Sequence, residues 1–435
     1  MIAAALLLAA ASSAAALVPA TARAALLLDG EAASSGFRAL LETAGARAGM
    51  ASPQAIGHDL RNAIGVDLLA GTAPWGLSPL GPRALVFESG SVALSAPVKD
   101  GKAARKQLDA WLAEEGPARP TRPAPLKGPA AAGQRAAMID HGRLFLGSGP
   151  HATALVNALA HLNGRSSLSK SRAFAAALAR ATGPAALFFR GGALLKGGVL
   201  ALDASASGLV ARGLVLPEGD GALLVGEAPR ACAAGLGCLR AELGGAGRAL
   251  LAAAAREYLF YRLAPPAREL VDALVQRASA TAGKLAVELQ GLDTRLLGDE
   301  RDSLRALRLS AAAEATAALP AQLPAGVTRT AAGLAAADLC VELPPGTVAL
   351  SSPCGPAPAL SGGSDHALDA ALDLAAVDRA LSKLSPLDAL NGPVAAGAYG
   401  VHLLWGGLLR NAGPLTVTGR PAGAAADLEL RLPLR

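Results

Sequence analysis

The chain has 435 residues, of which 52% are hydrophobic but only 3% aromatic, and its formal net charge is +6. The basic residues are scattered and never form a run of five, which argues against a nucleic-acid surface, where Lys and Arg cluster beside aromatic rings. Beyond the N-terminus, no uncharged apolar run reaches the length of about 18 residues expected of a membrane-spanning helix.

The first 24 residues predict a secretory signal peptide. Residues 2–20 are almost all Ala and Leu, Pro19 breaks the run, and Ala22 and Ala24 provide the small residues that a signal peptidase requires. Cleavage after Ala24 would place the mature protein in the periplasm or the medium. No basic residue precedes the apolar run, and about 20 residues can span a bilayer, so an uncleaved N-terminal membrane anchor is the alternative.

The N-terminal half alternates between helical and strand patterns. Residues 25–70 predict helix, residues 84–98 a β-hairpin, and residues 101–115 an amphipathic helix. The proline-rich stretch 116–129 predicts an exposed loop. Further along, the patterns predict a hairpin over 135–147, helices over 150–162 and 169–181, a strand over 185–190 and a hairpin over 199–216.

The C-terminal half begins with a long helical pattern. It covers residues 246–281 and is interrupted at Pro265 and Pro266. Strands are predicted over 284–290 and 303–311, a buried helix or strand over 394–409, and a hairpin over 414–432. The chain is therefore expected to be an α+β protein of antiparallel hairpins or sheets packed with helices. Its predicted divisions are a signal peptide at 1–24 and domains at 25–220 and 245–435.

The two halves of the sequence show a weak internal similarity. Residues 186–217 and 370–433 are both predicted to run from a strand through a helical stretch to a hairpin that ends on proline. This order predicts two related halves, and fortuitous similarity in an Ala- and Leu-rich chain is an equal alternative.

The four cysteines are predicted to form disulfides, because an even number in an exported chain is typical of them. Of the three possible pairings we favour the local one, Cys232 with Cys238 and Cys340 with Cys354. A zinc site would need ligands two to four residues apart and neighbouring histidines, which the sequence does not provide.

One segment has the outline of a dinucleotide-binding turn, Gly-x-Gly-x-x-Ala over Gly147–Ala152. The preceding strand belongs to a hairpin rather than a βαβ unit, and no acidic residue follows about 20 residues later. We interpret the segment as a strand-to-helix turn, with Ser148 or Gly149 near the N-cap and Pro150 first in the helix.

The other candidate motifs also favour structural roles. Ser364, Asp365 and His366 are adjacent, so their side chains diverge and cannot form a triad; Asp365 is predicted to cap a helix over 367–374. The histidines show no metal-binding spacing. They are His58, His141, His151, His161, His366 and His402. No catalytic residue, metal ligand or cofactor is predicted.

Residues 65–190 resemble a broad family of exported bacterial envelope proteins of unknown function. The resemblance rests on Gly65-Val66-Asp67, on Val98-Lys99-Asp100 before a helix, and on the Asp140–Ser148 strand followed by Ser171–Phe174. It implies an envelope or secreted α+β protein and carries no catalytic residues.

These observations predict a non-catalytic, exported binding or structural module for an apolar ligand or a protein partner. Few aromatic residues argue against carbohydrate binding, so an apolar groove suited to lipid or to a partner helix is the expected surface. The alternative is a secreted hydrolase whose site is assembled from residues distant in sequence.

Overall fold

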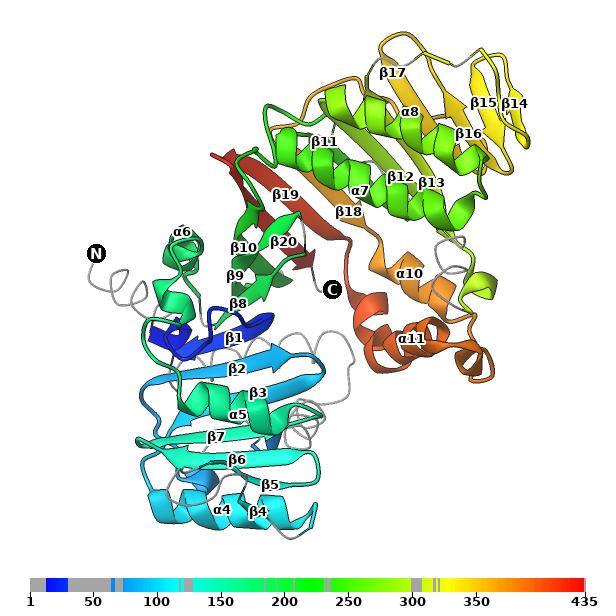
Figure 1. Ribbon diagram of the computed structural model, residues 1–435. Coiled ribbons are helices and arrows are strands. Elements are labelled where there is room, and N and C mark those ends of the chain that lie inside the picture. The colour runs from blue at the N-terminus through cyan, green and yellow to red at the C-terminus, as the bar shows by residue number, and fades with distance from the viewer. Residues whose placement is uncertain are drawn as a thin grey trace. The chain divides into compact units, whose positions relative to one another are not determined.

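The computed structural model describes residues 13–29, 64–66, 73–116, 119–120, 128–183, 185–192, 194–205, 208–230, 232, 236–298, 307–315, 318–319 and 321–433. The chain divides into two compact units (Figure 1). Unit 1 comprises residues 1–46 and 51–215, and unit 2 comprises residues 47–50 and 216–435.

Unit 1 is built on an antiparallel sheet. Within the described residues its strand order is β10-β9-β8-β1-β2-β3-β7-β6-β5-β4. The strands are β1 (Ala24–Asp29), β2 (Pro82–Glu88), β3 (Ser91–Pro97), β4 (Arg119–Pro120), β5 (Ala130–Ala132), β6 (Arg135–Asp140), β7 (Arg143–Ser148), β8 (Ala185–Arg190), β9 (Leu195–Ser205) and β10 (Gly208–Pro217). Its helical segments are η1 (Ala73–Trp75), α4 (Gly101–Ala113), α5 (Ala152–Ala160), η2 (Leu168–Lys170) and α6 (Ala175–Arg180).

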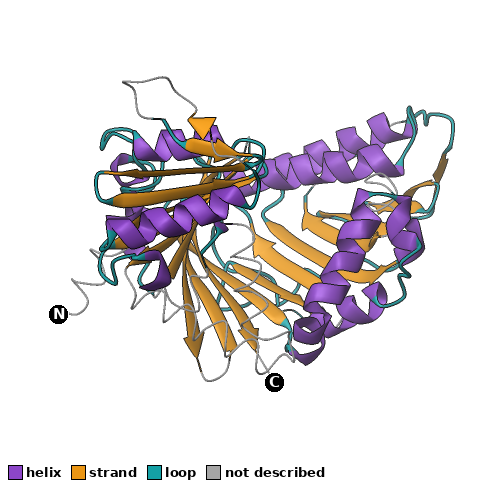
Figure 2. Ribbon diagram, turned by 90° about the horizontal axis from the view of Figure 1, so that it is seen from below, coloured by secondary structure: helices purple, strands orange, loops and turns teal. Residues whose placement is uncertain are grey.

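Helices cover both faces of the unit-1 sheet, as Figure 2 shows. On one face, Leu108 and Leu112 of α4 join the strand residues Leu85 and Leu94 in a buried cluster. On the other face α5 lies so close that a Cβ atom at Gly147 would be 2.7 Å from Cγ2 of Val156. The small residue in β7 is therefore what allows this helix to pack.

Two predicted hairpins of unit 1 are confirmed, and their turns explain why the sequence signalled them. Ser89 and Gly90 join β2 to β3 with φ values of 46° and 78°, and His141 and Gly142 join β6 to β7 with 46° and 71°. Two consecutive positive φ values define the tight turn whose twist matches paired strands, and glycine adopts them readily.

Unit 2 is also built on an antiparallel sheet. Within the described residues its order is β14-β15-β16-β17-β13-β12-β11-β18-β19-β20. The strands are β11 (Gly237–Glu242), β12 (Lys284–Leu292), β13 (Leu307–Glu314), β14 (Val327–Arg329), β15 (Gly333–Ala336), β16 (Leu339–Glu342), β17 (Thr347–Ser352), β18 (Leu368–Leu372), β19 (Leu415–Ala422) and β20 (Ala425–Pro433). The helical segments are α7 (Gly245–Arg262), α8 (Ala267–Thr281), η3 (Thr294–Leu296), α10 (Leu374–Leu381), η4 (Asp388–Asn391) and α11 (Pro393–Asn411).

The strands of the two units pair in the same order. Each strand of unit 2 occupies the place held in unit 1 by the strand numbered ten lower, from β1 and β11 in the middle to β4 and β14 at one edge. The connections differ. Residues 191–194 join β8 to β9, whereas α10, η4 and α11 are inserted between β18 and β19.

The predicted α+β fold class is wrong, because the fold is predominantly antiparallel sheet. The helix predicted from residue 25 onward begins instead as strand β1, in which Leu27 and Leu28 are both buried. A short apolar run buried on both faces has no period that separates strand from helix. Likewise, β18 replaces the helix expected over 367–374, and Asp373 rather than Asp365 is the N-cap of α10. The remainder of the predicted 25–70 helix falls mainly on residues 30–63 and 67–70, outside the described residues.

Candidate functional site

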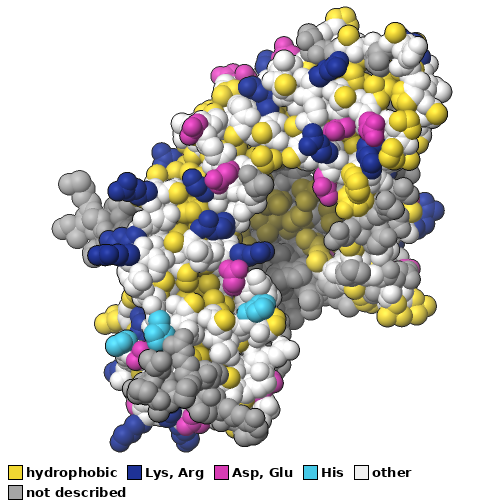
Figure 3. Space-filling model, viewed as in Figure 1, with side chains coloured by type: hydrophobic (Ala, Val, Ile, Leu, Met, Phe, Trp, Pro, Cys, Tyr) yellow, Lys and Arg dark blue, Asp and Glu magenta, His cyan; other side chains and the backbone are white. Residues whose placement is uncertain are grey.

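A groove with an aliphatic lining lies on one face of the unit-2 sheet. It has a volume of about 240 Å³ and crosses four neighbouring strands, β12, β11, β18 and β19. Figure 3 shows hydrophobic side chains at the surface in the region of β18 and β19. The lining residues are Gly237, Cys238, Leu239, Val287, Leu289, Ala370, Ala371, Leu372, Leu415 and Val417.

Strand register places the lining residues in two rows. In the first row, Leu239 is opposite Val287 on one side and Ala370 on the other, and Ala370 is opposite Val417. In the second row, Gly237 lies between Leu289 and Leu372. Directly opposite residues of an antiparallel sheet point to the same face, so the rows make one continuous aliphatic surface.

Helices α7 and α8 cover this face at one end of β12. Leu285 contacts the same small cavity as Val275 and Ala278 of α8, whereas Val287 and Leu289 line the open groove. Alternate residues of a strand share a face, so the three β12 residues belong to one surface. The groove is therefore the part of that surface that α7 and α8 leave uncovered.

Helices α10 and α11 stand at the other end of the groove. Leu372 and Leu415 are paired across β18 and β19; α10 begins at Leu374 and α11 ends at Asn411. Leu292 of β12 packs against the apolar cluster of these helices, which includes Leu381 and Leu384. The two strands at this end of the groove thus run directly into the helical hairpin.

The opposite face of the same strands is polar. The Nη2 atom of Arg240 lies 2.5 Å from Oε1 of Glu288, and Asp369 is paired with Arg240 in the strand register. The Arg240 side chain is only 7% exposed. The sheet is therefore amphipathic, with its charges on one face and the aliphatic groove on the other.

A charged cluster joins α10 to α11. Asp378 is buried, and its carboxylate accepts a hydrogen bond from Nδ1 of His402 at 2.8 Å while Nη1 of Arg410 lies 3.2 Å from its other oxygen. Among the hydrogen bonds of the described residues, His402 has this aspartate as its partner and no serine or cysteine. The hydrolase alternative thus finds a His–Asp pair here but, within that part of the chain, no nucleophile beside it.

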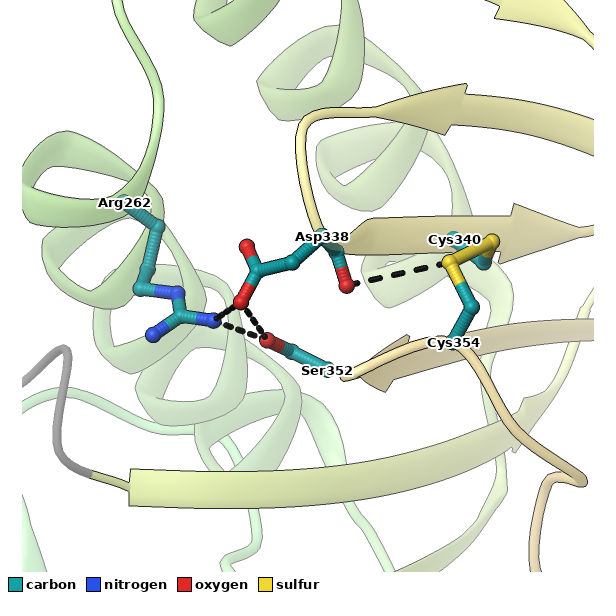
Figure 4. Close-up of polar contacts among 5 residues, drawn as sticks. All are labelled: Arg262, Asp338, Cys340, Ser352 and Cys354. Atoms are coloured by element: carbon teal, nitrogen blue, oxygen red, sulfur yellow. Dashed lines mark hydrogen bonds and ion pairs between the residues drawn. A yellow bond between two sulfur atoms is a disulfide. The ribbon is translucent and has the colours of Figure 1, made fainter. Parts of the chain in front are cut away.

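A second charged cluster lies beside a disulfide (Figure 4). Arg262 at the end of α7 donates to Asp338, in the turn between β15 and β16, at 2.5 Å, and also to the hydroxyl of Ser352 on β17. Burial raises the pKa of the neighbouring Tyr258, an effect that the positive charge of Arg262 opposes. The cluster ties the end of α7 to the turn between β15 and β16 and to the end of β17.

The disulfides have the local pairing that the sequence predicted, Cys232 with Cys238 and Cys340 with Cys354. Cys238 is in β11, and its neighbour Leu239 lines the groove. Cys340 and Cys354 connect β16 to the residues just after β17. These bonds indicate an oxidising, exported location.

None of the remaining motifs contributes a residue to the lining of the groove. The Gly147–Ala152 segment does lead from a strand into a helix, but the N-cap of α5 is His151, whose N–H donates to Ser91, and not Ser148 or Gly149. The Ser364 hydroxyl accepts a hydrogen bond from the backbone N–H of His366, in the segment just before β18. The described residues contain no group of three or more potential metal ligands.

The sequence predicted an apolar groove, but no residue could be assigned to it from the sequence alone. The signal was present in the alternation of Leu285, Val287 and Leu289, which is typical of a strand with one apolar face. The partner strands lie far apart in the sequence, so their order could not be deduced from this pattern.

Comparison of the chain with family models, curated proteins and solved structures finds no match. The resemblance of residues 65–190 to exported envelope proteins therefore stays a prediction. No described helix is long and apolar enough to cross a membrane.

Proposed function

We propose that the protein is an exported, non-catalytic lipid-binding module that holds one aliphatic chain in the unit-2 groove. The observation that carries this proposal is the lining, which consists of aliphatic side chains, glycine and a disulfide cysteine from four adjacent strands. An aliphatic chain needs no hydrogen bonds from its site, and burying its methylene groups contributes about 0.8 kcal/mol each.

The size of the groove supports a narrow ligand. Its volume of about 240 Å³ is below the roughly 300–1,000 Å³ typical of pockets that enclose ring-containing small molecules. None of the described residues that line it is aromatic, so these residues offer no ring on which a sugar or a base could stack. One extended hydrocarbon chain is the ligand that fits both observations.

The proposal is tested by titrating the mature protein with cis-parinaric acid, a fatty acid that fluoresces when it enters an apolar site. Ala370→Phe places a large side chain in the middle of the groove, and we expect it to weaken binding at least roughly tenfold, as expected when a site of this kind is filled. Gln290→Phe adds an aromatic side chain at an exposed position next to Leu289 and is the matched control.

We expect the control to bind like the unmodified protein. Absence of binding to the unmodified protein at micromolar concentrations, or equal affinities of all three proteins, would show that the groove is not a lipid site.

A further inference from the structure

The hairpin of α10 and α11 has two exposed leucines at its tip. Leu387 is 75% exposed and Leu390 is 80% exposed, and both lie at the 3₁₀ turn η4 between the two helices. Residues three apart in a 3₁₀ turn project from the same side, and Leu390 N–H donates to Leu387 C=O at 3.1 Å. The two side chains therefore form one small exposed apolar patch at the end of the α10–α11 hairpin.

Hydrogen bonds between Ser385 and Asp388, rather than contacts of the two leucines, stabilise the turn at this tip. Both the N–H and the hydroxyl of Ser385 donate to Oδ2 of Asp388 at 2.7 Å, and these bonds lower the pKa of the Asp388 carboxyl. Beneath the turn, Leu381 and Leu384 of the hairpin pack into the buried cluster. Leu387 and Leu390 are absent from that cluster, so folding gives no reason for their presence at the tip.

The hairpin is also an addition to the common strand plan. Unit 1 joins the corresponding strands β8 and β9 through residues 191–194, whereas unit 2 inserts α10, η4 and α11 at the same point. The insertion starts and ends at Leu372 and Leu415, which are paired lining residues of the groove. The leucine tip thus lies in the segment that joins two of the four strands of the groove, β18 and β19.

We propose that the tip docks on a lipid bilayer, with Leu387 and Leu390 inserted among the acyl chains, and that the groove takes its ligand from that membrane. This inference rests on the proposed function, because an aliphatic ligand resides in bilayers. The exposed Lys383 near the tip can approach lipid phosphates. Asp388, whose carboxylate accepts two hydrogen bonds from Ser385, stays charged and must remain at the level of the headgroups while the leucines insert.

The test is flotation of the mature protein with unilamellar vesicles of phosphatidylethanolamine and phosphatidylglycerol. Leu387→Ser with Leu390→Ser should reduce the vesicle partition coefficient by about tenfold or more, because each exposed leucine gains apolar burial on insertion. Leu80→Ser is the matched control, since Leu80 is 78% exposed in unit 1 and should leave partitioning unchanged.

Binding of cis-parinaric acid in solution separates this inference from the proposed function. The double serine variant should bind the fatty acid like the unmodified protein, which also shows that it is folded. Normal vesicle binding without fatty-acid binding would contradict the groove and leave the tip supported.

Three outcomes would overturn docking at the tip. The unmodified protein could fail to float with vesicles, or the double variant could float as well as the unmodified protein. A loss of self-association in the double variant, measured by sedimentation without any vesicle binding, would instead identify a second copy of the chain as the occupant.

Discussion

Nδ1 of His402 on α11 donates a hydrogen bond to the buried carboxylate of Asp378 on α10 at 2.8 Å. The Asp378 side chain is 2% exposed and that of His402 is 18% exposed. The pair therefore joins the two helices in a largely dry environment, where a polar contact is costly to break.

Asp378→Ala should lower the free energy of unfolding of unit 2 by about 3 kcal/mol, because it leaves His402 without its partner. Arg410→Met removes the other contact of the same carboxylate, but the arginine side chain is 57% exposed. Its loss should cost only about 0–1 kcal/mol. Urea unfolding followed by circular dichroism measures both values, and equal effects of the two substitutions would contradict the buried role of Asp378.

The Tyr258 hydroxyl should lose its proton at a higher pH than an exposed tyrosine does. Burial raises its pKa above the ordinary value of 10, so the unfolded chain loses this proton first as the pH rises. The contribution of Tyr258 to stability is fully present below pH 10 and is lost as the pH rises through its folded pKa. In a pH titration followed by absorbance at 295 nm, part of the tyrosine ionisation should occur above pH 10, and this part should disappear in Tyr258→Phe. Identical titration curves for the two proteins would refute the assignment.

Gly147→Ala should destabilise unit 1. The added Cβ would lie 2.7 Å from Cγ2 of Val156 and 3.2 Å from the carbonyl oxygen of Ala152, so α5 must move away from β7. We expect a loss of about 1–3 kcal/mol, as for other overpacked positions. Gly164→Ala meets nothing within 4 Å and should change the unfolding free energy by less than about 0.5 kcal/mol. Thermal unfolding of both variants tests this prediction. A similar loss of stability in both would indicate a general effect of replacing glycine rather than crowding between α5 and β7.

The mature protein should contain no free thiol, because its four cysteines form two disulfides. Titration with a thiol reagent in denaturant should give zero equivalents before reduction and four afterwards. Mass spectrometry of the same sample should place the N-terminus at Ala25. Four reactive thiols before reduction would contradict both the pairing and the oxidising location.

The features that could be predicted correctly from the sequence depend on residues that are close together in the chain. The hairpins at Ser89-Gly90 and His141-Gly142 depend on turns of two residues, and the break between α7 and α8 depends on Pro265 and Pro266. Each of these features is decided by neighbours in the chain, so a short window contains the evidence for it.

Features that depend on distant partners were missed or mistaken. Strand β18 looked helical because its leucines and alanines are good helix formers, and only its pairing with β11 and β19 makes it a strand. The groove has the same origin, since Leu239, Ala370 and Val417 meet only when these strands pair. No short segment of the sequence contains that information.

Strand β1 has a further consequence for how the chain reaches its final state. It precedes every other strand of the described residues in the chain, yet it lies between β2 and β8. Ala25 therefore cannot pair with Phe188 until residues of β8 have been made. A chain that emerges N-terminus first exposes this apolar edge throughout the interval, and such edges readily pair with other chains. Unit 1 can therefore complete the sheet on both sides of β1 only after β8 has been made.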